Sequence, residues 1–280
     1  MIKTKVVNKR SNSVIREDMH VNTALVLSGG IGTRMGTDIP KQYVRIGDKM
    51  MIMYCLETLA GHKDIDAIRI VADQGWQDVL LAEIKKYSNI EAKFVGFSEP
   101  GMNRQMSIVN GLRDMCATSL PNDLVMIHDA ARPNLSAAMI TDCFTAVVDH
   151  DGVLPTLPMK DTVYVSRDGN AITELLDRET IYAGQAPEVF VFGKYLEACE
   201  RLCEIEDNGD EFFEDEEDRE ENIAYAVSPA IMKICGSSEP AVMAGMDIVM
   251  IPGYETNFKV TTPTDLERFK AIIEARNAGN

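Results

Sequence analysis

Apolar and polar residues along this chain follow two different periodicities, one typical of strands and one typical of helices. Short apolar runs rich in β-branched residues predict strands over residues 23–28, 67–72, 91–97, 124–129 and 152–158. Between these runs, apolar residues recur at helical spacing and predict helices over residues 51–60, 76–87, 104–116 and 136–150. Strands that alternate with helices of this length are typical of a parallel sheet covered by helices on both faces. The sequence therefore predicts an α/β fold with a mostly parallel sheet.

The alternation of predicted strands and helices stops after residue 158. Two short apolar runs flank Asp168 and Gly169 within residues 162–175, which is typical of a β-hairpin, and we expect this hairpin to project from the sheet as a β-arm. The remaining pattern predicts strands over residues 188–192, 246–253 and 257–260, and helices over residues 193–205, 221–235 and 262–276. Thr264 is the expected N-cap of the last helix.

The chain shows no internal repeat and no segment that reads as an interdomain linker. With 280 residues, of which 45% are hydrophobic, it is long and apolar enough to bury a sizeable core. We expect a single domain over residues 22–280, with residues 1–21 as an N-terminal appendage. No apolar run approaches the ~18 residues of a membrane span, and the first residues lack the apolar stretch of a secretory signal. We therefore expect a cytoplasmic protein without a membrane partner.

Six cysteines are spread among apolar neighbours without a C-x-x-C pair. They are Cys55, Cys116, Cys143, Cys199, Cys203 and Cys235. Cys199 and Cys203 lie four residues apart on an expected helix, a spacing that a metal could use, but no second pair of ligands accompanies them. We interpret the cysteines as buried free thiols.

The net charge of −16 makes nucleic acid an unfavourable partner. Much of this charge is local, because residues 204–221 hold twelve acidic residues and one arginine. Such a block is typical of a solvated, mobile loop. A role in collecting cations or binding a partner is the alternative.

The stretch SGGIGTRMGTDIPK, residues 28–41, follows the first expected strand. Ligands of open α/β sheets bind at the carboxyl ends of the strands. Glycines let the backbone approach a ligand closely, and exposed N–H groups favour anions. Arg34 and Lys41 add permanent positive charge, so the expected ligand is the phosphate chain of a nucleotide. Neither the dinucleotide fingerprint nor the Walker A motif matches, and a tight strand–helix turn with surface cations is the alternative.

Two further segments carry candidate chemistry. In IHDAARP, residues 127–133, Asp129 suits metal or ribose binding and Arg132 suits anion binding, although the two could form an ordinary salt bridge. We interpret His128 between them as structural. Lys259 is expected within a short strand, where an inward lysine needs a carboxylate or phosphate partner. The alternative is that Lys259 faces solvent.

These segments together resemble a known family. GGxGTRMG…PKQ, the R-x-x-S of residues 104–107, HDAARP, the DR at 177–178 and N-x-K-V-T-x-P-x-D-L resemble the cytidylyltransferases that couple CTP to a small polyol phosphate. The family includes enzymes for 2-C-methyl-D-erythritol 4-phosphate and for ribitol 5-phosphate, and the similarity runs from about residue 22 to residue 276. The resemblance implies a Rossmann-like nucleotidyltransferase fold, Mg²⁺, CTP at the glycine loop and a homodimer formed through the β-arm.

The resemblance also implies roles for individual residues. The implied catalytic residues are Arg34 and Lys41, which contact the triphosphate, and Lys259, which reaches the α-phosphate. The implied nucleotide-binding residues are Ser28, Gly29, Gly30, Gly32, Gly101 and Ser107. The implied substrate-binding residues are Asp129, Arg132, Thr162 and Arg178, with Arg178 supplied by the partner subunit and Asp129 also near the metal.

Some positions depart from the family pattern. Ala186 stands where relatives usually carry threonine, Glu188 replaces a usual glutamine, and Met102 replaces a common aspartate. The acceptor therefore stays open, with methylerythritol phosphate slightly ahead of ribitol 5-phosphate. Two further classes also stay open. One is a sugar-1-phosphate nucleotidyltransferase that uses another NTP, and the second is a catalytically decayed nucleotide-binding protein.

Overall fold

A computed structural model describes residues 20–30, 39–203, 234 and 236–278 of the chain. Some of the predictions concern residues outside this set. They are the predictions on Gly32, Arg34, the thiol of Cys235, nearly all of the appendage 1–21, the acidic loop 204–221 and nearly all of the helix expected over residues 221–235.

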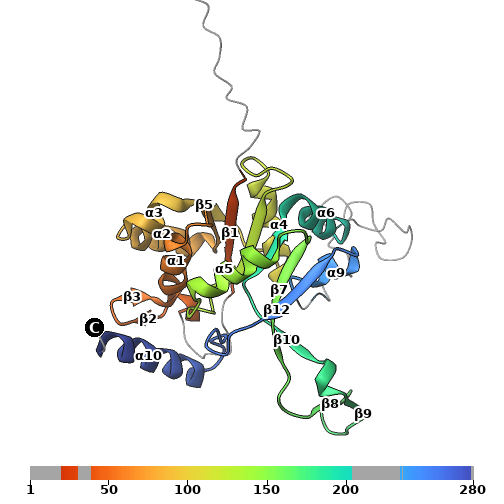
Figure 1. Cartoon of the computed structure of the whole chain (residues 1–280). Coiled ribbons are helices and arrows are strands. Elements are labelled where there is room, and N and C mark those ends of the chain that lie inside the picture. The colour runs from red at the N-terminus through yellow and green to blue at the C-terminus, as the bar shows by residue number, and fades with distance from the viewer. Residues whose placement is uncertain (1–19, 31–38, 204–233, 235, 279–280) are drawn as a thin grey trace, which may run out of the picture.

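The described strands form one large sheet and two short hairpins. The large sheet contains β5 (Phe94–Ser98), β4 (Ala67–Val71), β1 (Asn22–Leu27), β6 (Leu124–Asp129), β11 (Glu188–Val191), β7 (Gly152–Pro158), β10 (Tyr182–Gly184) and β12 (Ile248–Pro252). The first four lie side by side and are parallel. β11 runs antiparallel to both β6 and β7, β10 runs antiparallel to β7, and β12 runs parallel to β7 along its other edge. The predicted α/β fold with a mostly parallel sheet is confirmed (Figure 1).

Helices cover both faces of the sheet (Figure 1). One layer contains α1 (Met51–Gly61), α2 (Gln74–Ile84), α3 (Ser88–Lys93) and α5 (Ala137–Ala146), and the other contains α4 (Arg104–Met115), α6 (Phe192–Arg201) and α9 (Glu239–Met243). Successive side chains of a strand point to opposite faces, so Val26 belongs to the first apolar cluster and Leu25 to the second. Burial on both faces explains why residues 24–27 of β1 are all apolar.

The last helix, α10 (Pro263–Ala278), contributes Phe269 to a third apolar cluster, which also contains Met51 and Val260. Its cap differs from the prediction. The Asp265 N–H donates to Thr262 Oγ1 over 3.2 Å, and Asp265 Oδ2 accepts from the Thr262 N–H over 2.8 Å. This reciprocal capping box makes Thr262, not Thr264, the residue that caps the helix.

The predicted β-arm is present. β8 (Val163–Val165) and β9 (Glu174–Leu176) pair antiparallel and project from the body of the molecule (Figure 1). Asp168 Oδ1 accepts hydrogen bonds from the N–H groups of Asn170 and Ala171, both over 2.9 Å, and Gly169 has a φ of +76°. Asp168 and Gly169 therefore turn the chain at the tip, as their sequence indicated.

Some expected elements differ from the structure. The strand expected over residues 91–97 begins at Phe94, because residues Ser88–Lys93 form helix α3. Residues 257–260 form a loop instead of a strand. The short hairpin of β2 (Arg45–Ile46) and β3 (Lys49–Met50) was not predicted, and neither were β10 and α9.

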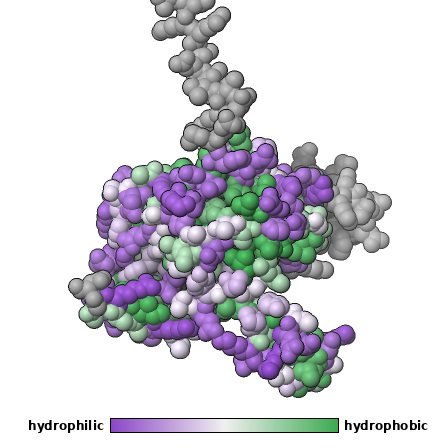
Figure 2. Space-filling model, in the orientation of Figure 1, coloured by the Kyte–Doolittle hydropathy of each residue, from purple (hydrophilic) through white to green (hydrophobic). Residues whose placement is uncertain are grey.

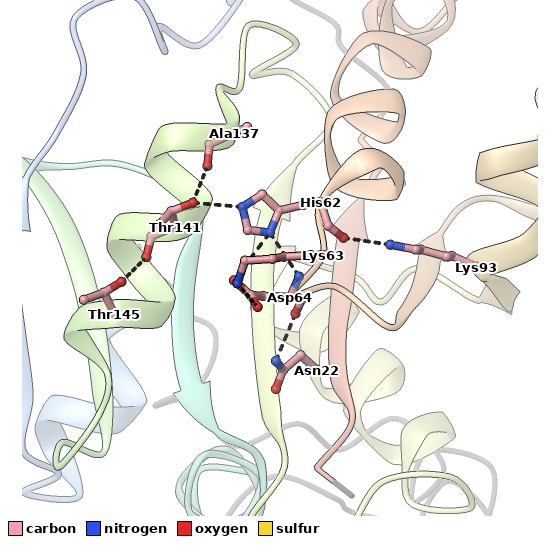
Figure 3. Close-up of polar contacts among 8 residues, drawn as sticks. All are labelled: Asn22, His62, Lys63, Asp64, Lys93, Ala137, Thr141 and Thr145. Carbon is pink, nitrogen blue, oxygen red and sulfur yellow. Dashed lines mark hydrogen bonds and ion pairs between the residues drawn. The ribbon is translucent and has the colours of Figure 1, made fainter.

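A hydrogen-bonded junction ties the amino end of the sheet together (Figure 3). His62 Nδ1 accepts from the Asp64 N–H over 3.2 Å, which leaves the proton on Nε2 to donate to Thr141 Oγ1 on α5 over 3.0 Å. Lys93 Nζ donates to the His62 carbonyl, and Asn22 Nδ2 on β1 donates to the Asp64 carbonyl. We name these five residues the His62 junction. It joins α5, β1 and the end of α3 to the turn that follows α1.

The five described cysteines are all free, and Cys55, Cys143 and Cys199 are buried as predicted. Cys116 is exposed and Cys203 is half-buried, so the prediction that the thiols are buried is wrong for these two. In the described part of the chain no group of three or more His, Cys, Asp or Glu side chains is placed to hold a metal. None of the described helices is long and apolar enough to cross a membrane.

Candidate active site

A cavity of about 510 Å³ opens where β1 and β6 end. Leu27 and Asp129 are the last residues of these neighbouring parallel strands and lie in register. The carboxyl ends of the strands thus bring the glycine loop and the HDAARP segment to one edge of the sheet. The cavity is lined by Leu27, Ser28, Gly29, Gly30, Lys41, Gln42, Gly101, Met102, Asn103, Arg104, Ser107, Asp129, Ala130, Ala131, Lys259 and Thr261.

Asp129 lies between two cations at this edge. Its Oδ1 accepts from Arg104 Nη2 over 2.9 Å and from Arg104 Nε over 3.2 Å, and its Oδ2 lies 2.8 Å from Lys259 Nζ. Burial opposes ionisation of this carboxyl, but Arg104 and Lys259 outweigh that effect and hold its pKa well below the ordinary value. The group is therefore a carboxylate, and the three side chains together carry a net charge of about +1.

The expected alternative of an Asp129–Arg132 salt bridge is not what the structure contains. Arg132 Nη1 instead donates to the Asn257 carbonyl over 2.7 Å. Arg132 does not line the cavity, so its predicted substrate contact is not visible in this single chain.

Lys259 projects from a loop that is fixed to its surroundings. Besides the Arg132 contact, Asn257 Nδ2 donates to the Ala186 carbonyl and the Val260 N–H donates to the Ala131 carbonyl, both over 2.7 Å. Lys259 has the carboxylate partner that an inward lysine needs, although its side chain is 38% exposed and its backbone is not a strand.

Ser28, Gly29 and Gly30, at the start of the glycine loop, form one wall of the cavity. A Cβ atom at Gly29 would lie 2.5 Å from Pro100 Cβ, so this position has no room for a side chain. Lys41 begins a short 3₁₀ turn, Lys41–Tyr43, that follows the loop. Gly32 and Arg34, which belong to the same predicted site, lie outside the described residues.

The turn that leads into α4 forms the opposite wall. The Gly101 N–H donates to Ser107 Oγ over 3.0 Å, and Ser107 Oγ donates to the Asn103 carbonyl over 2.8 Å. Asn103 Oδ1 also caps α4 by accepting from the Met106 N–H. A Cβ atom at Gly101 would lie 2.3 Å from Met106 Cβ, so the tightness of this turn requires glycine. Met102 is 62% exposed at the rim.

Thr162 and Arg178 lie near the base of the β-arm, and neither lines the cavity of the same chain. Arg178 Nη1 donates to the Lys160 carbonyl over 3.1 Å. Arg104 and Gln42, in contrast, line the cavity although the sequence predicted no role for either. Arg104 lies within the R-x-x-S motif, and Gln42 lies within PKQ.

Two buried titratable groups lie behind the cavity. His128 Nε2 donates to the Arg132 carbonyl over 3.1 Å, and burial lowers the pKa of its imidazole to about 4. This agrees with the structural role expected for His128. Glu188 accepts a short hydrogen bond from Ser237 Oγ, and burial raises the pKa of its carboxyl to about 7.

The sequence profile of 2-C-methyl-D-erythritol 4-phosphate cytidylyltransferase, named IspD, matches residues 22–218. Ribitol-5-phosphate cytidylyltransferase of Lacticaseibacillus paracasei is 27% identical over 256 residues, which cover 91% of this chain and 98% of the relative. 2-C-methyl-D-erythritol 4-phosphate cytidylyltransferase of Desulforamulus reducens is 28% identical over 256 residues, which cover 91% of this chain and 96% of the relative.

Solved structures show the same fold. The 4-diphosphocytidyl-2C-methyl-D-erythritol synthase of Anaerococcus prevotii superimposes with a TM-score of 0.68 at 20% identity, over 91% of this chain and 96% of its own. The cytidylyltransferase of Francisella tularensis gives a TM-score of 0.66 at 22% identity, over 89% of this chain and 98% of its own. Because the family profile matches well over half of the chain, and the relatives are matched along almost their whole length, the chain belongs to the IspD family of cytidylyltransferases.

Proposed function

We propose that this protein transfers CMP from CTP to a small polyol phosphate and releases pyrophosphate. The observation that carries the proposal is the convergence of Lys41, Arg104 and Lys259 with a glycine loop on one cavity. CTP and a phosphate monoester are both anions, so a site that brings them together needs fixed positive charge.

In the proposed reaction, an oxygen of the acceptor phosphate attacks the α-phosphorus of CTP in line with the leaving group. A bond forms between that oxygen and the α-phosphorus. The bond from the α-phosphorus to the bridging oxygen breaks, and its electron pair leaves with pyrophosphate. The nucleophile is already an anion at neutral pH, so the reaction needs no strong general base. Positioning and charge stabilisation supply the catalysis.

The cavity residues act through charge. Lys41, together with Arg34, holds the triphosphate, and Lys259 reaches the α-phosphate. Asp129 fixes the directions of Arg104 and Lys259 through the contacts of 2.9 Å and 2.8 Å, so both cations are oriented before CTP arrives.

Mg²⁺ is part of the proposal. Among the described residues that line the cavity, Asp129 is the one acidic side chain, and the described part of the chain holds no cluster of three ligands. Mg²⁺ commonly binds one or two carboxylates together with substrate phosphates and water. This donor set fits an ion that arrives with the phosphates of CTP and touches the protein at Asp129. When bound, Mg²⁺ neutralises charge on the phosphates.

The acceptor proposed first is 2-C-methyl-D-erythritol 4-phosphate, an intermediate of isoprenoid precursor synthesis, and ribitol 5-phosphate is the alternative. The family profile carries the first name. The relatives carry both names at 27% and 28% identity, so identity alone favours neither.

We further propose a homodimer formed through the β-arm. Tyr164, Ile172 and Leu175 on the arm and Tyr182 beside it are 47–65% exposed. Figure 2 shows hydrophobic colouring on the arm, which stands apart from the body. Burial against a second copy would remove this apolar surface from water. It would also carry Thr162 and Arg178 toward the partner's cavity, where the acceptor phosphate binds.

Pyrophosphate release measured with CTP, UTP, ATP and GTP, each with Mg²⁺ and both acceptors, tests the proposed function. We expect turnover with CTP at least tenfold above the others. Equal or greater turnover with UTP would contradict cytidylyl transfer and favour a nucleotidyltransferase of another specificity.

A further inference from the structure

Gln42 and Tyr43 lie directly behind the glycine loop, and the proposed reaction gives them no role. We propose that these two side chains, here named the loop clamp, are positioning residues that hold Ser28, Gly29 and Gly30, the first residues of the glycine loop, in the arrangement that receives the triphosphate. The inference rests on the proposed function, because it names how the same site is organised for CTP.

Gln42 holds the loop at two points. Its Nε2 donates to the Ser28 carbonyl over 2.6 Å and to the Gly30 carbonyl over 2.8 Å. Both partners are carbonyl oxygens, so only the NH₂ end of the amide can face them. The side chain is 3% exposed, and its two hydrogen bonds are therefore shielded from competition with water.

Tyr43 holds the same strand end from a second direction. Its hydroxyl lies 2.6 Å from Ser28 Oγ and 3.0 Å from the Ser28 carbonyl. The ring packs against Trp76 on α2, with 4.6 Å between the ring centroids. Tyr43 is therefore fixed on its far side by the helix layer and on its near side by the loop.

These contacts set the direction of a loop amide. In a trans peptide the carbonyl and the following N–H point in opposite directions. With the Ser28 carbonyl held toward Gln42, the Gly29 N–H points away from the loop clamp. Gly29 lines the cavity, and within the described part of the chain its N–H has no acceptor. An amide directed in this way is suited to a phosphate oxygen.

The loop clamp also links the loop to a cation. Lys41, Gln42 and Tyr43 are the three residues of one 3₁₀ turn. The hydrogen bonds from this turn to Ser28 and Gly30 therefore fix Lys41 relative to these first residues of the glycine loop. Small displacements of positioned charges lower the rate of a reaction that depends on electrostatics.

A purely structural role makes a different prediction. A buried, satisfied glutamine that only supports folding would lower stability when it is replaced, and the remaining folded enzyme would keep its affinity for CTP. A positioning role predicts loss of CTP affinity and turnover in folded protein, with the KM for the acceptor little changed.

The test compares Gln42→Met, which keeps the length of the side chain but removes both donors, with Tyr43→Phe and the control Gln77→Met. Gln77 on α2 also donates to a backbone carbonyl, that of Ala72 over 3.0 Å, but does not line the cavity. The measurements are the Kd for CTP by calorimetry, kcat and both KM values, and the thermal midpoint in the full-length enzyme.

For Gln42→Met we expect a kcat/KM for CTP lower by about 10- to 100-fold. The acceptor KM should stay within about twofold, and Gln77→Met should behave as wild type. A folded Gln42→Met variant with wild-type CTP binding and turnover would overturn the proposal.

If Gln42→Met does not fold, the Tyr43→Phe variant tests the loop clamp in its place. It keeps the ring packing and loses the hydroxyl contacts, so the loop clamp predicts CTP binding weaker by about 3- to 10-fold, and unchanged binding would overturn it. Wild-type enzyme without CTP-dependent turnover would overturn the proposed function together with the loop clamp. Active wild type with unaffected variants would overturn the loop clamp alone.

Discussion

At the scale of a single residue, replacing Lys259 tests whether positive charge at the cavity supports the proposed reaction. It pairs with the buried Asp129 at the cavity, whereas Lys270 on α10 pairs with Glu267 at the surface. The two lysine side chains are equally exposed, at 38% each. We expect Lys259→Ala to lower kcat by about 10² to 10³ and Lys270→Ala to leave it unchanged.

Lys41→Ala should lower kcat as much as Lys259→Ala does, since both cations face the phosphates in the proposed reaction. Steady-state pyrophosphate release, with far-ultraviolet circular dichroism as the check on folding, measures these effects. Near-normal turnover of a folded Lys259→Ala variant would remove this residue from the mechanism.

Glu188 gives a prediction about pH and stability. Its carboxyl has an ordinary pKa of 4.5, and burial raises the pKa to about 7 in the folded protein. The folded state thus binds this proton more tightly than the unfolded state does. The stabilisation is complete below pH 4.5 and is lost as the pH rises through 7.

Glu188→Gln removes this dependence. The free energy of unfolding of Glu188→Gln minus that of the wild type should be larger at pH 8 than at pH 5, by up to about 3 kcal/mol. Urea unfolding at both pH values measures the change, and the exposed Glu91→Gln serves as control. An equal difference between Glu188→Gln and wild type at both pH values would show that Glu188 does not titrate in this range.

Much of the candidate site could be predicted residue by residue, because its signals are local. The glycines, Lys41 and Asp129 follow strand ends, and the carboxyl ends of parallel strands meet at one edge of a sheet. Arg104 carries no such signal. Its role depends on where α4 begins relative to β6, and its partner Asp129 lies 25 positions further along the chain.

At the scale of elements, strand and helix periodicity predicted the central sheet well and the loops less well. Residues 257–260 resemble a strand in sequence because the apolar Phe258 and Val260 alternate with polar residues. The segment is in fact held by separate contacts to Ala131, Arg132 and Ala186 instead of a ladder. Long-range contacts of this kind leave no periodic trace in the sequence.

The His62 junction makes a prediction at the same scale. It lies at the amino end of β1, opposite the cavity, so His62→Ala should lower the free energy of unfolding by about 1–3 kcal/mol at pH 7.5. Its kcat should stay that of the wild type. Burial lowers the pKa of His62, so its contribution is complete above about pH 6.5 and is lost as the pH falls.

Urea unfolding of His62→Ala at pH 7.5 and pH 5, beside the exposed neighbour Lys63→Ala, checks this prediction. The difference between His62→Ala and wild type should shrink at pH 5. A large loss of turnover with unchanged stability would contradict the assignment of the junction to folding.

At the scale of the whole molecule, the exposed apolar residues of the β-arm predict a homodimer. Ile172 on the arm is 65% exposed, and Val148 beyond α5 is exposed to nearly the same extent, at 64%. We expect Ile172→Asp to convert the dimer to monomer and Val148→Asp to leave it intact, since a charge at a buried interface is costly. Sedimentation velocity measures the assembly directly. A monomeric wild type, or a dimeric Ile172→Asp variant, would contradict an interface formed by the arm.

The proposed acceptor site also belongs to the scale of the whole molecule. Thr162 and Arg178 lie near the base of the arm, outside the cavity of their own chain. The sequence predicted the arm from its hairpin signal, but in the proposed homodimer the geometry of the acceptor site would depend on how the second copy docks. For this reason the nucleotide side of the site could be predicted further than the acceptor side.

Cytidylyl transfer is tested most directly by pyrophosphate release from CTP and Mg²⁺ with a panel of acceptors. The panel contains 2-C-methyl-D-erythritol 4-phosphate, ribitol 5-phosphate, glycerol 3-phosphate and phosphocholine. We predict release that depends on one polyol phosphate, with methylerythritol phosphate first and ribitol 5-phosphate as the alternative. CTP binding without release on any of the four would contradict the proposed reaction with these acceptors and indicate a nucleotide-binding protein.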